Sequence, residues 1–140
     1  MTRTATREDY NNLLLSWFKE YSWTAVPYEC LPSNQFITEY NNTPAVYTCY
    51  YSAECSLALL GFTIANPLLD IPSSVVEEAL RFTIEHAKST GHKYIRYSTG
   101  QKGVGIVRKL KKLGMSVICP KGYIMHMATD NSDISFLEED

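Results

Sequence analysis

The feature that most restricts the fold of this chain is a helical segment enclosed by two strand-like runs. Residues 75–91 carry apolar side chains at helical spacing, and apolar runs at 56–66 and 93–99 lie on either side. A strand, a helix and a second strand in this order form a crossover whose strands lie parallel, with a right-handed connection. The sequence therefore predicts a mixed α/β domain that contains one parallel pair.

The remaining segments predict antiparallel strands and shorter helices. Thr6, Arg7, Glu8 and Asp9 match a capping box, and a helix with an apolar face is expected after it. Polar turns separate the strand-like runs, as in antiparallel hairpins. Besides the unbroken strand at 56–66, the chain is expected to contain strands at 35–40, 45–52, 115–120 and 123–128, a loop at 26–35 and a basic helix at 103–114.

Length and charge limit the classes of protein that this chain can belong to. With 140 residues, 45% apolar residues and a net charge of −2, we expect a single domain at residues 1–128 and an acidic tail at 129–140. The negative balance disfavours a nucleic-acid binder. No apolar run approaches the length of a membrane span, and the first residues lack the apolar core of a signal peptide. A cytoplasmic location is expected.

The four cysteines show no metal-binding or redox spacing. Cys30, Cys49, Cys55 and Cys119 form no C-x-x-C pair, so no metal site is predicted. Three of them lie in apolar sequence surroundings and are expected to be buried, reduced thiols.

Three stretches carry a resemblance to a known family. The element order, with "LALLGFTIANP", "VVEEALRFTIEHAKSTGHKYIRYST" and "VRKLKKLGM", resembles the GNAT superfamily of N-acetyltransferases. The segments "REDY", "LLLSWFKEY" and "LPSN" are also similar to small bacteriophage proteins of this type, which would place the chain in the host cytoplasm. The resemblance spans roughly residues 3 to 128. It implies an acyl-CoA N-acyltransferase fold, with a mostly antiparallel central sheet, one parallel crossover and flanking helices.

The resemblance implies an acetyl-CoA-dependent N-acetyltransferase, but the phosphate loop of the family is missing. In that family a glycine-rich loop holds the pyrophosphate at the start of the helix after the long strand. Here "NPLLDIPSSV" (66–75) contains neither glycine nor arginine. The glycine-rich "GQKGVG" (100–105) lies too late, because only 35 residues follow Gly105 where the family needs on the order of 60.

The resemblance also implies which residues of this chain would contact the coenzyme. The main chain of Thr63, Ile64 and Ala65 would meet the pantetheine arm. The amides at the helix start, of Ser73, Ser74 and Val75, would hold the phosphates. The alternative at that helix start is plain capping, with Ser74 as the N-cap and Glu77 completing a capping box. Gly103 stands where the family keeps an asparagine, and Arg108 could meet the ribose phosphate or belong to a solvated basic face.

Catalytic groups are less clearly marked. Leu110 occupies the position at which many family members place an acidic tyrosine. Tyr97, or alternatively Tyr94, is the candidate general acid. Glu54, or alternatively Glu29, is the candidate general base, and all four also suit structural or surface roles. The loop at 26–34 would shape the acceptor side.

Two hypotheses for the function remain. The first is acetyl transfer from acetyl-CoA to an unidentified amine, on a small molecule or a protein, with a non-standard pyrophosphate loop. The alternative is a catalytically degenerate binding protein of the same fold, such as a phage protein acting on host or virion components. A nucleic-acid or membrane partner is not expected, and association through a sheet or helix face stays open.

Overall fold

The computed structural model describes residues 1–99, 104–119 and 124–129, which fall into two compact units. The first unit contains residues 1–49 and 62–83, and the second contains residues 50–61 together with the described residues after 83. Strand β3 (Thr43–Ser52) and helix α3 (Ser73–Ser89) each supply residues to both units. The units are described one at a time.

The first unit begins with strand β1 and a helical stretch whose hydrogen-bonding pattern changes along its length. The consecutive segments are β1 (Thr2–Thr4), α1 (Arg7–Asp9), the π-helical segment η1 (Tyr10–Leu14) and α2 (Leu15–Glu20). Thr6 Oγ1 accepts a hydrogen bond from the Asp9 amide at 3.2 Å, and Asp9 Oδ2 accepts one from the Thr6 amide at 2.8 Å. This reciprocal pair confirms the predicted capping box.

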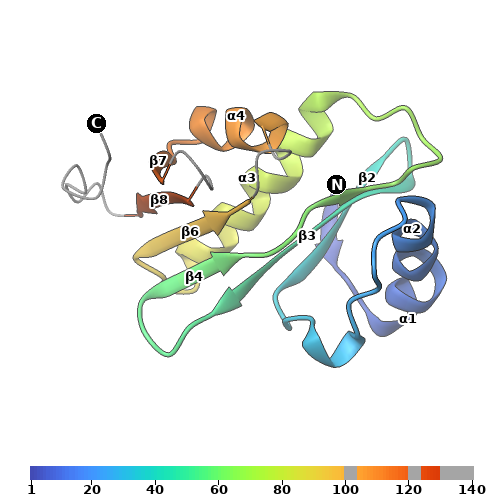
Figure 1. Ribbon diagram of the computed structural model, residues 1–140, viewed down its shortest axis with the longest axis horizontal. Helices are drawn as coiled ribbons and strands as arrows, with labels where there is room; N and C mark the ends of the chain where they lie inside the picture. The colour runs from blue at the N-terminus through green and yellow to red at the C-terminus, as the bar shows by residue number, and fades with distance from the viewer. Residues whose placement is uncertain (100–103, 120–123, 130–140) are drawn as a thin grey trace. The chain divides into compact units, whose positions relative to one another are not determined.

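The sheet of the first unit is antiparallel (Figure 1). Its strands pair in the order β1, β2 (Gln35–Tyr40), β3 and β5 (Ile64–Ala65). The turn between β2 and β3 holds Asn41 and Asn42 at φ values of 51° and 61°, as a tight two-residue hairpin requires. The predicted hairpin is therefore confirmed, and the predicted loop contains a short 3-10 helix, η2 (Tyr28–Cys30).

Aromatic side chains dominate the core of the first unit. Trp17 and Phe18 of α2 are 2% and 1% exposed, as their helical spacing predicted. Phe62 stacks on Tyr47 of β3 with 5.1 Å between ring centroids and lies 5.5 Å from the Phe18 ring. The first half of α3 packs on β3 through a cluster of Ala45, Val46, Val75 and Ala79.

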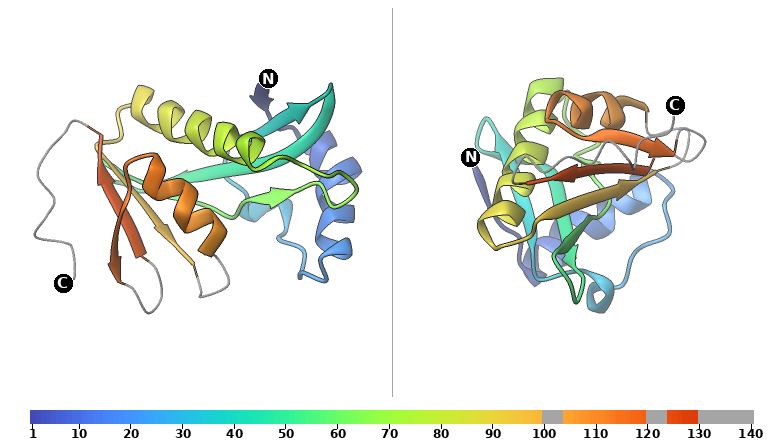
Figure 2. Two further views of the ribbon diagram at one scale, coloured as in Figure 1. Left: turned by 90° about the horizontal axis from the view of Figure 1, so that it is seen from above. Right: turned by 90° about the vertical axis from the view of Figure 1, so that its left-hand side faces the viewer.

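The second unit contains the parallel pair. The last residues of β3 pair antiparallel with β4 (Leu57–Leu60), which pairs parallel with β6 (Tyr94–Ser98). Strand β8 (Ile124–Ala128) then lies antiparallel between β6 and β7 (Ser116–Cys119). Helix α4 (Val104–Lys112) covers one face of these last strands (Figure 2). The pairing of β4 with β6 confirms the predicted crossover through α3.

Two strand predictions differ from the structure. The run at 56–66 is not one strand: β4 ends at Leu60, and β5 begins only at Ile64. Gly61 has no side chain to pack on a sheet. The Phe62 ring packs with Tyr47 and Phe18, and the strand does not continue through this residue. Strand β1 was not predicted, because three residues of Thr and Arg show no apolar alternation.

Helices α3 and α4 end two residues before Gly91 and Gly114, the last residues of the ranges expected for them. Gly91 follows α3 with φ 91°, and Gly114 follows α4 with φ 100°, which are left-handed conformations that favour glycine. Of the helices in the described residues, none combines the length and the apolar character of a transmembrane span.

Candidate functional site

The start of α3 is reached through a loop that Asn66 organises. Asn66 Nδ2 donates to the Pro44 carbonyl at 2.9 Å, and Asn66 Oδ1 accepts from the Leu68 amide at 3.0 Å. The helix begins at Ser73, directly after Pro72, so Ser74 lies inside the first turn. The predicted N-cap at Ser74 is therefore wrong, because the chain enters the helix one residue earlier.

The three residues predicted to bind phosphate differ in what they offer. Ser73 and Ser74 are exposed, and among the described residues their amides donate no hydrogen bond. The first amides of a helix lack partners within the helix and attract anions. Val75 is different: its side chain is 7% exposed in the core, and its amide donates to the Pro72 carbonyl at 3.0 Å. An anion at this helix start would therefore rely on Ser73 and Ser74.

Charged side chains surround the first turns of α3. A shallow cavity of about 290 Å³ is lined by Ser74, Glu77, Glu78 and Arg81. Glu77 lies 3.3 Å from the Arg81 guanidinium, and Glu78 lies 3.7 Å from the Met1 ammonium. Each carboxylate thus has a cationic neighbour, which reduces its repulsion of an anion at the helix start.

The residues predicted to meet a pantetheine arm lie at β5. Ile64 is buried and pairs with Tyr47, and Ala65 pairs with Val46. The Ala65 carbonyl accepts a hydrogen bond from the Tyr21 hydroxyl at 2.9 Å. Thr63 precedes the strand and is half-buried. A ligand amide at Ala65 would therefore share or displace the tyrosine bond.

A second cavity of the first unit, of about 430 Å³, lies between the N-terminal helix and the following loop. It is lined by Arg7, Tyr28, Glu29, Leu31, Pro32, Ser33 and Gln35. The Arg7 guanidinium lies over the Tyr28 ring, 4.9 Å from its centroid, in a cation–π contact. Gln35 is buried, and its Oε1 accepts from the Tyr47 hydroxyl at 2.9 Å.

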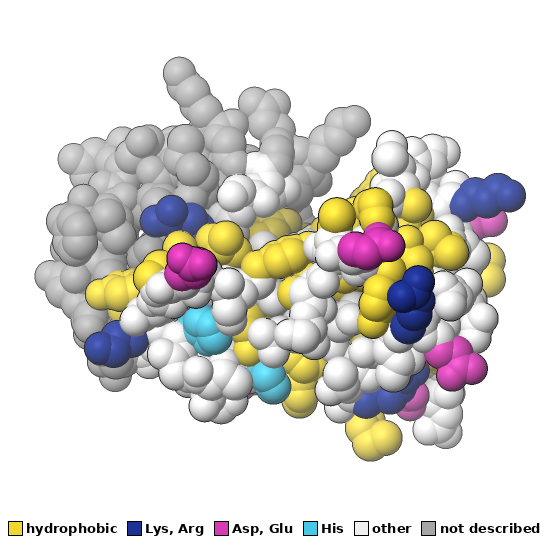
Figure 3. All heavy atoms as spheres, turned by 90° about the horizontal axis from the view of Figure 1, so that it is seen from below, with side chains coloured by type: hydrophobic (Ala, Val, Ile, Leu, Met, Phe, Trp, Pro, Cys, Tyr) yellow, Lys and Arg dark blue, Asp and Glu magenta, His cyan; other side chains and the backbone are white. Residues whose placement is uncertain are grey.

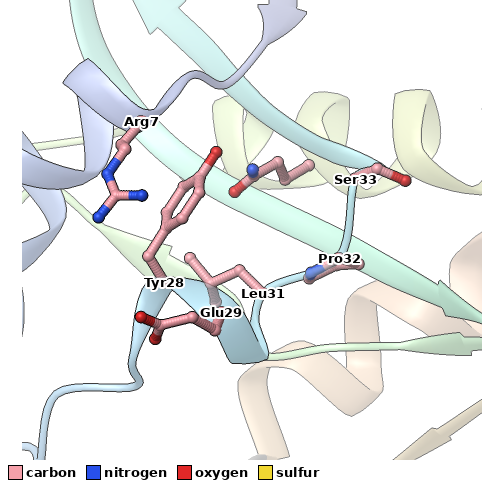
Figure 4. Close-up of a pocket in the computed structure, with 7 residues that line it drawn as sticks. Arg7, Tyr28, Glu29, Leu31, Pro32 and Ser33 are labelled. Atoms are coloured by element: carbon pink, nitrogen blue, oxygen red, sulfur yellow. The ribbon is translucent and has the colours of Figure 1, made fainter.

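The lining of this cavity combines one cation, one anion, an aromatic face and an apolar floor. Figure 4 shows Arg7 and Glu29 on one side, Pro32 and Ser33 on the other, and the Tyr28 ring beside Arg7. Such a site can pair with both an ammonium and an anionic or hydrogen-bonding group of a small molecule. The loop at 26–34 was predicted to shape the acceptor side. The cavity adds Arg7 and Gln35, for which no binding role was predicted.

The predicted catalytic residues belong to the second unit. Tyr97 of β6 is 8% exposed, whereas Glu54 lies exposed in the turn between β3 and β4. Arg108 is exposed on α4, and Leu110, which stands at the expected tyrosine position, is fully buried. Gly103 lies outside the described residues.

The cysteine prediction is wrong. Cys49 is buried, but Cys30 and Cys55 are exposed, so three buried thiols cannot exist. Cys30 lies on η2 and Cys55 in the turn after β3, and both segments run along the surface. Among the described residues, no group of three or more histidine, cysteine, aspartate and glutamate side chains could hold a metal ion.

Comparison with solved structures identifies the fold. The N-acetylglutamate synthase of Neisseria gonorrhoeae, solved with coenzyme A and L-arginine, matches with a TM-score of 0.72 at 13% identity. The match covers 94% of this chain and 33% of that one. The aminoglycoside acetyltransferase AAC(6')-Ib, solved with coenzyme A and kanamycin, matches with a TM-score of 0.71 at 15% identity, over 92% of this chain and 94% of that one. The fold is that of the GNAT acetyltransferases.

A GNAT-family acetyltransferase from Streptococcus pneumoniae shows the same likeness, with a TM-score of 0.70 at 14% identity over 91% of this chain and 98% of that one. No family model and no curated protein matches the sequence. The expected fold class, mixed α/β with one parallel pair and flanking helices, is confirmed. At such low identities the likeness concerns the fold, and the ligands belong to the relatives.

Proposed function

We propose that this chain is an acetyl-CoA-dependent N-acetyltransferase that acts on an amine. The observation that carries the proposal is a likeness over more than nine-tenths of the chain to acetyltransferases solved with coenzyme A. The chain spans about a third of the first of these relatives but nearly the whole of the second.

The coenzyme phosphates are proposed to lie at the start of α3. The support is the pair of exposed serines, Ser73 and Ser74, whose amides have no partner among the described residues. With no glycine in this loop, the phosphates would approach the main chain less closely than in the resembled family. Further proposed contacts are Thr63, Ile64 and Ala65 for the pantetheine arm.

The reaction needs a base for the amine and an acid for the departing thiol. The amine nitrogen attacks the thioester carbonyl, a C–N bond forms, and the C–S bond breaks as the thiolate leaves. Glu54 is proposed to accept the proton of the amine, directly or through water, and Tyr97 to protonate the thiolate. Tyr97 is mostly shielded from water, which suits a group that donates one proton to a defined atom.

The acceptor is proposed to be a small molecule that binds in the cavity beside Arg7 and Tyr28. A volume of about 430 Å³ lies within the range of small-molecule sites. Glu29 would attract an ammonium group, and Arg7 would attract a carboxylate or phosphate of the same ligand.

The alternative remains a GNAT-fold binding protein that has lost catalysis. The missing glycine loop and the buried Leu110 at the usual tyrosine position favour it. Coenzyme binding without release of free thiol, tested with a panel of amines, would favour this alternative over catalysis.

Calorimetry with acetyl-CoA tests the proposed binding, with Ser74→Asp as the decisive variant. An aspartate in the first turn stabilises a helix by about 0.3–1 kcal/mol but repels phosphate, so weaker binding could not result from unfolding. We expect at least about a fivefold loss of affinity, equivalent to about 1 kcal/mol. Ser16→Asp adds the same charge on the exposed face of α2 and should bind as the wild type. No binding heat with the wild-type protein would overturn the proposal.

A further inference from the structure

Five side chains of the second unit form a continuous hydrogen-bonded row. His92 Nε2 lies 2.7 Å from Ser52 Oγ, and His92 Nδ1 lies 3.0 Å from Thr90 Oγ1. Thr90 Oγ1 lies 3.0 Å from the Tyr50 hydroxyl, which lies 2.8 Å from His86 Nδ1. The row joins the end of β3 to the end of α3 and the turn after it. Nothing in the proposed acetyl transfer uses these residues.

The tautomer of His92 follows from its main-chain partner. The Ala87 carbonyl lies 3.0 Å from His92 Nδ1, and a carbonyl can only accept a hydrogen bond. Nδ1 therefore carries the proton of the neutral ring, and Nε2 is the bare nitrogen. Ser52 Oγ must then donate to Nε2, which polarises the hydroxyl towards its alkoxide form.

The imidazole is held in place from several sides. The His92 amide donates to the same Ala87 carbonyl at 3.2 Å, in the turn that Gly91 makes at φ 91°. The ring also packs edge-on against Tyr50, with 5.4 Å between centroids and 77° between planes. A hydroxyl, a bare imidazole nitrogen and a group that orients the ring are the three parts of an activated nucleophile. Here a main-chain carbonyl takes the place of a carboxylate.

The serine is accessible to a reagent. Ser52 is exposed at the last position of β3, His92 is half-buried, and Figure 3 shows histidine side chains at the molecular surface. In the turn that follows, the amides of Glu54, Cys55 and Ser56 donate no hydrogen bond to another described residue. Unpartnered amides of this kind are the usual donors to an oxyanion.

We propose that Ser52 is a nucleophilic serine, activated by His92, which accepts acyl groups from activated esters or thioesters. Ser52 Oγ would attack the acyl carbon while its proton passes to His92 Nε2. The bond to the leaving alcohol or thiol breaks, and Nε2 returns the proton to that group. The products are acyl-serine and a free alcohol or thiol, and water can then hydrolyse the ester with the same base.

The test uses p-nitrophenyl acetate without any coenzyme, so its outcome is independent of acetyl-CoA binding. We expect wild-type protein to release p-nitrophenol and to gain the mass of one acetyl group, which peptide mapping places on Ser52. Ser52→Ala, a small change at an exposed site, should abolish this label while the protein stays folded.

Two further variants separate activation from mere exposure. His92→Ala should slow labelling by about a hundredfold or more, the usual contribution of a general base, and added imidazole should restore part of the rate. Ser89→Ala removes an exposed serine whose Oγ donates to the His86 carbonyl at 2.7 Å, and should label as the wild type. The proposal is overturned if wild-type Ser52 carries no acetyl group, or if His92→Ala labels at the wild-type rate.

Discussion

The two main helical stretches that begin in the first unit differ in how their N-terminal ends are capped. At α1, Asp9 accepts hydrogen bonds from the amide and hydroxyl of Thr6, at 2.8 and 3.0 Å, and from both terminal nitrogens of Arg3, at 2.7 and 2.8 Å. At α3, Pro72 precedes the helix and has no side-chain group that can cap it. The start of α1 is capped by side chains of the protein, whereas the start of α3 leaves main-chain amides at the surface without a cap.

This difference separates a structural helix start from a candidate binding one. Donors already paired within the protein gain little from a ligand, whereas unpaired donors at the surface can exchange water for an anion. The N-terminal start should therefore matter for stability and the α3 start for binding. Four predictions test this contrast.

The largest effect is expected for Asp9→Ala. The change removes the capping box and leaves Arg3 without its closest carboxylate, so we expect a loss of about 2–3 kcal/mol in the free energy of unfolding, measured with urea. Glu8→Ala in the same turn is the matched control, because Glu8 is exposed. Equal losses in both variants would show that the Asp9 contacts do not stabilise the fold.

The second prediction concerns pH. The Arg3 guanidinium, helped by hydrogen bonds from Thr6, holds the pKa of Asp9 below its ordinary value. A carboxyl group with a lowered pKa stabilises the fold above its unfolded pKa of about 3.9 and loses this contribution as the pH falls. The difference in unfolding free energy between wild type and Asp9→Asn should be constant near neutrality and should shrink below about pH 4. A constant difference down to pH 2 would contradict the lowered pKa.

The third prediction concerns a capping residue introduced at the start of α3. Pro72→Asp introduces a capping side chain and should stabilise the protein by about 0.5–1 kcal/mol. The same carboxylate should weaken acetyl-CoA binding, because it occupies the amides and repels phosphate. Pro72→Ala separates the gain of a cap from the loss of proline. If Pro72→Asp bound the coenzyme as well as Pro72→Ala does, the phosphates would not lie at this helix start.

The smallest effect is expected for Ser74→Ala. Because Ser74 lies inside the first turn, its loss should change stability by less than about 0.5 kcal/mol. Thr6→Ala at the start of α1 should cost about 1 kcal/mol. Comparable losses in the two variants, measured by thermal unfolding, would mean that Ser74 caps α3 after all.

Sequence patterns predicted the elements that repeat apolar residues over several turns or strand positions. Helix α3, the β2–β3 hairpin and the parallel crossover followed from such patterns. Local patterns failed where contacts distant in sequence decide the structure. The ring of Phe62 packs with Tyr47 and Phe18, and this interrupts a run that looks like a single strand.

The candidate sites were harder to predict than the fold. The loop at 26–34 was predicted to shape the acceptor side, but Arg7, which lines the same cavity as Tyr28, lies far from that loop in the sequence and is unremarkable alone. Ser52 and His92 are 40 residues apart, and only the turn at Gly91 brings the imidazole to the hydroxyl. No periodicity or spacing rule predicts contacts between residues so distant in the sequence.

The π-helical segment η1 has a consequence for how this chain can vary in length. Such a segment accommodates one residue more than an α-helix would, and Asn11 and Asn12 lie exposed within it. Exchanging either asparagine should be harmless, and deleting one should be tolerated as well. The deletion would remove the extra residue and leave a regular α-helix, so that Trp17 keeps its position relative to the capped end. Deleting the exposed Leu15 or Ser16 of α2 would instead rotate Trp17 and Phe18 by about 100° away from the core.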